Sequence, residues 1–465
     1  MLTEALQSKL EAIIGAGNVF AGDDIGEHYR VDVLRKFTSK PAFMVRPATT
    51  EQVSEVMKLA NEAGIPVTPV GGQTGTAGGA IPSDGGIALS LERMNRIEQI
   101  DLDAMTLTIE AGCVLQTAQE AVEKEGAFLP LDLGSRGSAT IGGNIASNAG
   151  GNRVLRWGMM RDMVIGLEAV LADGTIVSSL TKMLKDNAGY SWKQLLIGSE
   201  GTLAVVTRAV LRLRPLPSTN QTALVACSSF DNCIRLLRKL EVGTSGRLSS
   251  YELLWGDFYQ VMTELQLPSR PRPMPGGHAY YVLLEALGGD AESDPAQFER
   301  LLAEEIEAGT VEDAVIAQNE RERQALWAVR EDFGPWIKNL KLSISYDVSM
   351  SIADMPGFVD RMRSGVTKAF PNATMMFYGH AGDGNLHAIV DAGDPDASHS
   401  DEIDAIVFDI VSTVNGSIAA EHCVGVLRKP HLGKSRSDAE LMVMQRIKSA
   451  LDPRNVMNPG KVLSA

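Results

Sequence analysis

Two histidines stand close together in the segment Phe377–His387, which runs Phe-Tyr-Gly-His-Ala-Gly-Asp-Gly-Asn-Leu-His. Strand-forming residues flank its Gly-Asp-Gly-Asn core, which is a strong signal for a tight turn. If Asp383 and Gly384 are the central residues of a two-residue turn, His380 lies directly opposite His387. Opposed residues in an antiparallel pair have Cβ atoms about 4.5–5.5 Å apart. The spacing therefore predicts two imidazoles that share one divalent metal ion.

The same register places Tyr378 opposite Ile389, on the face that carries the histidines. Two unrelated histidines are the alternative, but the chain has only 7 histidines, so an opposed pair is less readily explained by chance. A second chemical pair, Glu421-His422, ends the apolar run that begins at Ser417. A charged side chain at the end of an apolar segment is buried with it and needs an ionic or hydrogen-bonding partner.

Glycines form three clusters in the first half of the chain. The densest runs from Pro69 to Gly79, and it lets successive backbone N–H groups converge on an anion without a Cβ in the way. It matches neither the dinucleotide fingerprint nor the Walker loop, which disfavours nicotinamide and ATP. The other clusters lie within 130–151 and 198–203. Three glycine-rich turns favour an extended groove for a long diphosphate cofactor over a flexible surface loop.

The elements that must position these residues alternate between strands and helices. Short strands and two helices, Thr50–Ala63 and Val114–Gly126, predict an α+β domain before the Pro-bearing linker Arg214–Ser218. After the linker, strands such as Tyr280–Ala286 alternate with helices such as Gln318–Glu331. We predict three regions: residues 1–216, residues 217–415, and a C-terminal segment, residues 416–465.

Composition limits the classes of function. A length of 465 residues suggests two or three folded units. A formal net charge of −15 argues against a nucleic-acid partner. The 4 cysteines do not form the close pairs of a zinc or iron–sulfur site. No apolar run is long enough to span a membrane, and the N-terminal residues lack the features of a secretion signal. These observations predict a cytoplasmic enzyme.

The three glycine clusters resemble the FAD-binding domain of the vanillyl-alcohol-oxidase-type flavoproteins. Together with the C-terminal motifs, they are similar over essentially the whole chain to the D-lactate and D-2-hydroxyglutarate dehydrogenase branch. The resemblance implies a PCMH-type FAD-binding domain, then an α/β substrate domain with an antiparallel sheet, and a C-terminal segment that returns to the active site. The first glycine loop has no histidine or cysteine for attachment, so non-covalent FAD is implied. The implied cofactor-binding residues are Pro69, Gly71, Gly72, Gln73, Thr74, Gly75, Gly78, Asp132, Leu133, Gly142, Gly143, Asn144, Ser147, Ala149, Gly150, Gly201 and Asn458.

The resemblance also implies roles in catalysis. Glu421 would complete a metal site with His380 and His387, leaving coordination positions open as a catalytic metal requires; Zn²⁺ and Mn²⁺ both remain open. His422 would remove the proton of the substrate hydroxyl, and hydride would pass to the flavin. Arg330 lies where the family places its carboxylate-binding arginine, and a guanidinium suits that geometry. The enzyme would oxidise a D-2-hydroxy acid.

The chain departs from the hydroxyglutarate branch at three positions that contact the distal carboxylate. Ser345 replaces a lysine, Ile389 an asparagine, and Gly334 lies near the position of a threonine. These departures favour D-lactate, with D-malate and D-2-hydroxyglutarate kept open because another basic residue could bind the distal group. The predicted substrate pocket comprises Tyr346, Ser345, Ile389 and Asn385.

Several alternatives accompany this prediction. A glycolate-oxidase-type flavin subunit that works with partner chains is the second enzyme class, and a flavin-binding scaffold without activity is the third. Electrons are expected to leave to electron-transfer flavoprotein or a quinone-linked partner, and the family suggests a homodimer. Cys423 stands where the family has glycine. We interpret it as a small packing residue and expect Cys423→Gly to keep most activity.

Overall fold

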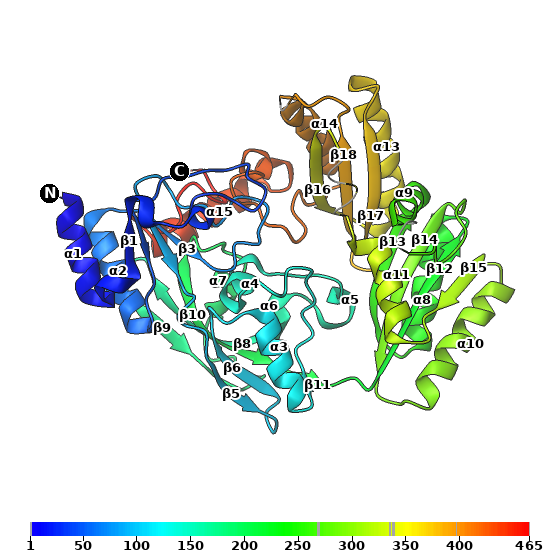
Figure 1. The fold of residues 1–465 in the computed structure, drawn as a ribbon, viewed down its shortest axis with the longest axis horizontal. Coiled ribbons are helices and arrows are strands. Elements are labelled where there is room, and N and C mark those ends of the chain that lie inside the picture. The colour runs from blue at the N-terminus through cyan, green and yellow to red at the C-terminus, as the bar shows by residue number, and fades with distance from the viewer. Residues whose placement is uncertain (1, 267–269, 334–335, 337–339, 397, 465) are drawn as a thin grey trace. The chain divides into compact units, whose positions relative to one another are not determined.

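The computed structural model describes residues 2–266, 270–333, 336, 340–396 and 398–464. The chain forms two compact units (Figure 1). The first comprises Met1–Gly151, Gly158–Leu216 and Glu421–Ala465, and the second comprises Asn152–Trp157 and Pro217–Ala420. The division between Leu216 and Pro217 falls within the expected linker. The C-terminal residues join the first unit from Glu421, instead of forming a separate region from Gly416.

The first unit contains a mixed sheet in the order β1-β2-β4-β3. Both β2 and β3 run parallel to β4, and α2 connects β2 to β3. Thr49 caps α2 by accepting a hydrogen bond from the Gln52 N–H, and Gly64 ends it in the left-handed conformation. The elements are α1 (Leu2–Ile14), β1 (Val19–Ala21), β2 (Phe43–Val45), α2 (Thr50–Ala63), β3 (Val67–Val70) and β4 (Ile87–Ser90).

An antiparallel sheet in the order β5-β6-β10-β8-β9 completes the framework of this unit. Thr140 caps α4 by accepting a hydrogen bond from the Gly143 N–H, so the second glycine cluster begins a helix instead of forming only a turn. The elements are β5 (Ile97–Asp101), β6 (Thr106–Glu110), α3 (Leu115–Lys124), β7 (Ala127–Phe128), α4 (Ile141–Ser147), α6 (Met160–Met163), β8 (Val164–Leu171), β9 (Ile176–Ser179), α7 (Lys193–Leu196), β10 (Ala204–Arg212), β11 (Arg214–Pro215) and α15 (Asp438–Leu451).

The second unit is built on a seven-stranded sheet in the order β15-β12-β14-β13-β17-β18-β16. Every neighbouring pair is antiparallel, which confirms the antiparallel sheet expected for this region. The strands are β12 (Thr219–Cys227), β13 (Leu248–Trp255), β14 (Tyr280–Gly288), β15 (Asp313–Ile316), β16 (Ser343–Ser349), β17 (Thr374–His380) and β18 (Asn385–Asp391).

Helices cover both faces of this sheet (Figure 1). One apolar cluster joins the sheet to α8, α10, α13 and α14, and another joins the opposite face to α9 and α11. No helix among the described residues is long and apolar enough to cross a membrane. The helices are α5 (Val154–Trp157), α8 (Phe230–Gly243), α9 (Gly256–Gln266), α10 (Ser293–Glu307), α11 (Glu320–Glu331), α13 (Met355–Ala369) and α14 (His399–Thr413).

Candidate active site

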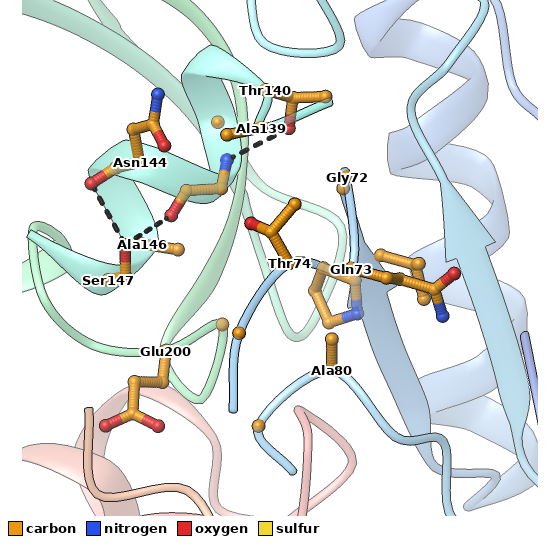
Figure 2. Close-up of a pocket in the computed structure, with 18 of the residues that line it drawn as sticks. Gly72, Gln73, Thr74, Ala80, Ala139, Thr140, Asn144, Ala146, Ser147 and Glu200 are labelled. Atoms are coloured by element: carbon orange, nitrogen blue, oxygen red, sulfur yellow. Dashed lines mark hydrogen bonds between the residues drawn. The ribbon is translucent and has the colours of Figure 1, made fainter. Parts of the chain in front are cut away.

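A cavity of about 960 Å³, which includes open solvent at its mouth, lies where the three glycine clusters of the first unit meet (Figure 2). Most of the predicted cofactor residues line it: Pro69, Gly71, Gly72, Gln73, Thr74, Gly75, Gly142, Gly143, Asn144, Ser147 and Gly201. Several other residues line the cavity without having been predicted as cofactor contacts, namely Leu91, Ala111, Glu200, Ala204 and Val206. Four of these, Leu91, Ala111, Ala204 and Val206, are buried and apolar, so no chemical signal distinguishes them from core residues.

Six predicted cofactor residues are not among those that line this cavity: Gly78, Asp132, Leu133, Ala149, Gly150 and Asn458. Asn458 is buried, and its side-chain amide donates hydrogen bonds to the carbonyls of Gly79 and Glu200 at 2.9 and 2.8 Å. Its carbonyl oxygen accepts a bond from Thr68. Asn458 therefore joins two glycine loops to each other, and residues of both loops line the cavity.

The cavity is suited to a long ligand with several hydrogen-bond acceptors. A Cβ on Gly72 would come within 2.0 Å of the Ser138 carbonyl oxygen, so the loop passes this backbone at a distance that only glycine allows. At Gly75 a Cβ would meet no described atom within 4 Å. The buried amide nitrogen of Asn144 lines the cavity and has no hydrogen-bond partner within the described part of the chain. A donor of this kind needs an acceptor, and FAD supplies such acceptors.

His422 and Cys423 also line this cavity. Hydrogen bonds hold the loop from His422 to Gly425 from two sides. The Glu200 carboxylate accepts hydrogen bonds from the N–H groups of Val424 and Gly425, both at 2.8 Å. Arg428 is buried and donates to the carbonyls of His422 and Cys423 at 3.3 and 2.8 Å. Figure 2 shows the Glu200 side chain extending towards the C-terminal part of the chain. This arrangement fixes the backbone of the proposed base at the cavity wall.

Two further features of this loop are unusual. Burial raises the pKa of Glu200, and the two N–H donors only partly oppose that shift. Cys423 adopts a φ of 67°, a left-handed conformation that is costly for a residue with a Cβ. This conformation explains why glycine would suit position 423. The thiol is 3.8 Å from the Ser147 carbonyl oxygen.

In the second unit, the histidine hairpin forms with a different register from the predicted one. Tyr378, and not His380, lies opposite His387. The turn occupies Ala381–Gly384, four residues instead of two, so the pairing moves by two positions. The predicted facing pair Tyr378–Ile389 is therefore wrong, and Ile389 faces Met376.

A shift of two positions preserves the face on which each side chain lies, because the side-chain period of a strand is two. His380 and His387 consequently still meet, in a diagonal arrangement. Their ring centroids are 5.3 Å apart, with an angle of 78° between the ring planes. Both residues are buried, at 5% exposure each. The structure therefore brings the two predicted metal ligands together.

Arg330 lies beside this pair, joined to it through Glu252. The Glu252 carboxylate is 2.6 Å from His380 Nδ1 and 3.0 Å from Arg330 Nε. Burial alone would raise the pKa of Glu252, but His380 and Arg330 together lower it below its usual range. The guanidinium also lies 4.9 Å from the ring centroid of Tyr378. The predicted carboxylate-binding arginine is thus a buried, oriented cation and not a solvated helix residue.

The predicted substrate residues divide between the two faces of the sheet. Ser345 pairs with Ile389, and Asp347 pairs with His387, so all four share the face of the histidines. Ile389 is buried in the apolar cluster of that face. Asn385 shares it, and its buried side-chain oxygen has no hydrogen-bond partner among the described residues. Gly334, the third departure from the hydroxyglutarate branch, lies outside the described residues.

Tyr346 is a correction to the predicted pocket. It alternates with Ser345 and Asp347, so it points to the opposite face. There its hydroxyl donates to Asp404 on α14 at 2.6 Å, and its ring packs against Phe408. Tyr346 therefore belongs to the core beneath α14.

Glu421 stands at the point where the chain passes from the second unit to the first. The N–H of Ala420, the last residue of the second unit, donates to the carbonyl of Asp347 at 3.2 Å. In the first unit, the Glu421 carboxylate accepts a hydrogen bond from the Gly151 N–H at 2.8 Å. The other oxygen lies 3.7 Å from His422 Nε2. A role of Glu421 as the third metal ligand stays a prediction.

Two family models match the chain. The FAD binding domain matches residues 41–179, and the C-terminal domain of FAD linked oxidases matches residues 216–462. The chain belongs to the FAD-linked oxidase family. Within this family it is 35% identical to the mitochondrial D-2-hydroxyglutarate dehydrogenase of Bos taurus, over 98% of this chain and 82% of that protein. It is 34% identical to the D-2-hydroxyglutarate dehydrogenase of Xanthomonas citri pv. viticola, over 94% of this chain and 92% of that protein.

A third relative is the Schizosaccharomyces pombe protein named "Putative D-lactate dehydrogenase C713.03, mitochondrial", with 33% identity over 93% of this chain and 84% of that protein. These relatives place this FAD-linked oxidase in the predicted D-lactate and D-2-hydroxyglutarate dehydrogenase branch. It is an FAD-dependent oxidoreductase.

Solved structures of the same fold confirm the architecture. Alkyldihydroxyacetonephosphate synthase matches with a TM-score of 0.75 and 17% identity, over 98% of this chain and 84% of that chain. Substrate-bound p-cresol methylhydroxylase matches with a TM-score of 0.76 and 16% identity, over 99% of this chain and 96% of that chain. At such low identity these likenesses show the fold alone, and it is the predicted fold of this FAD-linked oxidase.

Proposed function

We propose that this protein oxidises a small D-2-hydroxy acid to the 2-oxo acid, with non-covalent FAD as the immediate acceptor and a divalent metal, Zn²⁺ or Mn²⁺, at the histidine pair. One observation carries the proposal: His422, the proposed base, lies in the wall of the cavity that fits the flavin. A proton acceptor at that wall can take the proton of a substrate hydroxyl whose carbon faces the cofactor.

The residues of the chain divide the work. His422 accepts the hydroxyl proton, and the loop from His422 to Gly425 is held by Glu200 and Arg428. Arg330 binds the substrate carboxylate as a buried guanidinium. When bound, FAD supplies a two-electron acceptor and the metal a Lewis acid.

His380, His387 and Glu421 would hold the metal. Glu421 follows Ala420, whose N–H is bonded to Asp347, and Asp347 is the strand partner of His387. Consecutive Cα atoms are about 3.8 Å apart. This tether supports Glu421 as the third ligand, because its backbone begins beside the strand that carries His387.

The substrate pocket favours a short acid. Ile389 is 5% exposed and packs in an apolar cluster with Met376 and Tyr378, which offers nothing to a second carboxylate. Its strand partner Ser345 is exposed and uncharged. Seven relatives are named for D-2-hydroxyglutarate and one for D-lactate, so the preference for a short acid rests on Ile389 and Ser345 alone. We therefore favour D-lactate and keep D-malate and D-2-hydroxyglutarate as substrates to be tested.

Anaerobic reduction of the bound flavin tests the proposal. D-lactate should bleach the flavin absorbance, and L-lactate, the matched control, should not. Bleaching by D-2-hydroxyglutarate or D-malate alone would contradict the pocket argument from Ile389 and Ser345 but keep the reaction class. If none of these D-2-hydroxy acids reduces the flavin, the proposed reaction is wrong. Dialysis against a chelator should abolish reduction, and added Zn²⁺ or Mn²⁺ should restore it.

The electron acceptor, the assembly state and the compartment stay predictions. We infer transfer to electron-transfer flavoprotein or a quinone-linked partner, a homodimer, and a cytoplasmic location, although seven relatives are named as mitochondrial. Peroxide formation during turnover in air would instead favour an oxidase of the glycolate-oxidase type with partner chains.

A further inference from the structure

Glu252 is a candidate functional residue that none of the sequence motifs identifies. It lies on β13 with its side chain fully buried, and its strand partner on β17 is His380. One carboxylate oxygen is 2.6 Å from His380 Nδ1, and the other is 3.0 Å from Arg330 Nε. A single carboxylate thus contacts both a proposed metal ligand and the proposed substrate-binding arginine.

The first contact determines which nitrogen of His380 is available to a metal. An ionised carboxylate only accepts hydrogen bonds, so Nδ1 of His380 carries the proton and donates it. Nε2 then keeps its lone pair. A carboxylate behind a metal-binding histidine fixes the tautomer and the ring orientation, and it makes the free nitrogen a stronger ligand.

The second contact aims the arginine. Because Nε of Arg330 bonds Glu252, the planar guanidinium has its orientation set by that bond. Its Nη2 lies 3.3 Å from His380 Nε2 and donates to the lone pair that Glu252 leaves there, so a bound metal would replace this hydrogen bond. The group that binds a substrate carboxylate and the group that binds a metal are therefore directed to one point by one side chain.

We propose that Glu252 is a positioning residue that couples metal affinity to binding of the substrate carboxylate. The proposal rests on the proposed function, because it takes His380 as a metal ligand and Arg330 as the carboxylate clamp. Loss of the Glu252 charge should weaken both interactions at once. Flavin binding should not change, because the cofactor cavity belongs to the first unit.

A purely structural ion pair is the alternative, and the chain offers a matched control for it. Glu285 lies on β14 of the same sheet and is 1% exposed. It accepts a hydrogen bond from Asn220 at 3.1 Å and pairs with Arg153 and Arg323 at 3.5 and 3.6 Å. Removing either buried carboxylate charge should cost stability, but only Glu252 contacts a proposed metal ligand.

The experiment compares wild type, Glu252→Gln, Glu252→Asp and Glu285→Gln, each loaded with FAD and stripped of metal. Competition with a chromophoric chelator measures the affinity for Zn²⁺ and for Mn²⁺, and steady-state rates give KM and kcat for the acid that reduces the flavin. Glu252→Gln should bind metal about 10- to 100-fold more weakly and show a raised KM at unchanged flavin content. Glu252→Asp, which keeps the charge but is one methylene shorter, should recover part of the metal affinity. It also serves as the test variant if Glu252→Gln does not fold.

Three outcomes separate the ideas. Glu285→Gln should lower the thermal midpoint while its metal affinity stays within about twofold of wild type, the precision we expect of the titration. If wild type binds metal but the Glu252 variants bind it equally well, Glu252 has only a structural role and this inference is overturned alone. If wild type itself binds neither Zn²⁺ nor Mn²⁺, the metal part of the proposed function fails as well.

Discussion

Two alanine substitutions in the first glycine loop separate folding from cofactor binding. At Gly72 a Cβ would lie 2.0 Å from the Ser138 carbonyl oxygen, whereas ordinary contact begins at 3.4 Å. The two backbone segments would have to separate by about 1.4 Å, the difference between these values. Overpacking of this kind costs about 1–3 kcal/mol or more. At a cost of about 3 kcal/mol, Gly72→Ala should lower the thermal midpoint of the FAD-free protein by about 6–12 °C.

Gly75 is the matched control in the same loop. A Cβ there meets no described atom within 4 Å, and Gly75 is not among the glycines with positive φ. Gly75→Ala should therefore leave the midpoint of the FAD-free protein unchanged or raise it, because alanine restricts the unfolded chain. Its methyl group would enter the cavity and should weaken FAD binding at least tenfold, about 1.4 kcal/mol. Differential scanning fluorimetry and flavin fluorescence titration measure the two effects. Unchanged FAD affinity in Gly75→Ala would show that the cofactor does not contact this part of the loop.

Three further predictions concern the loop of His422 and the substrate pocket. Cys423→Gly should raise stability by about 1 kcal/mol, because it removes a left-handed Cβ conformation, and a more than tenfold loss of activity would refute the packing role. The double variant Ser345→Lys and Ile389→Asn should raise kcat/KM for D-2-hydroxyglutarate relative to D-lactate by about tenfold or more; an unchanged ratio would mean that these positions do not contact the substrate tail. Because burial raises the pKa of Glu200 above 4.5, its contribution to stability is present below that pH and is lost as pH rises through the folded pKa. The wild-type thermal midpoint should therefore fall relative to that of Glu200→Gln as the pH rises above 4.5, and a constant difference would count against the raised pKa.

The elements of the fold were largely predictable because local patterns specify them. Helix α2 occupies the predicted residues, with Thr49 as a capping residue and Gly64 as a left-handed end. Helix α15 begins with a similar local signal, a capping box formed by Ser437 and Glu440. Near Thr140 the same kind of signal was misread, because two glycines after a capping threonine suggested a turn. The helix packs closely against Ala111 at Gly142, where a Cβ would come within 2.8 Å of the Ala111 Cβ. This position of the helix therefore has room for glycine but not for a larger residue.

Packing around the cavity was predictable only in part. Gly71 and Gly72 belong to a glycine cluster that itself predicts a ligand, whereas Asn144 was assigned through the family resemblance, and all three line the cavity. Asn458 was predicted as a cofactor contact, and in the structure it joins two loops through two hydrogen bonds and accepts a third from Thr68 on β3. A sequence shows that such a polar residue needs partners, and it does not show whether those partners are protein or ligand.

The histidine pair shows why a wrong register still placed the two histidines together. The turn has four residues instead of two, which moves the pairing by two positions and leaves each side chain on its predicted face. A shift of one position would have sent His387 to the opposite face, with Tyr346 and Phe408. Because of the two-residue period, the prediction that the two histidines lie on one face holds in either register. The prediction of which residue lies opposite each histidine does not. Glu252 had no such local signal, because 128 positions separate it from His380 in the chain. Only the pairing of β13 with β17 reveals that a buried carboxylate stands behind the proposed metal ligand.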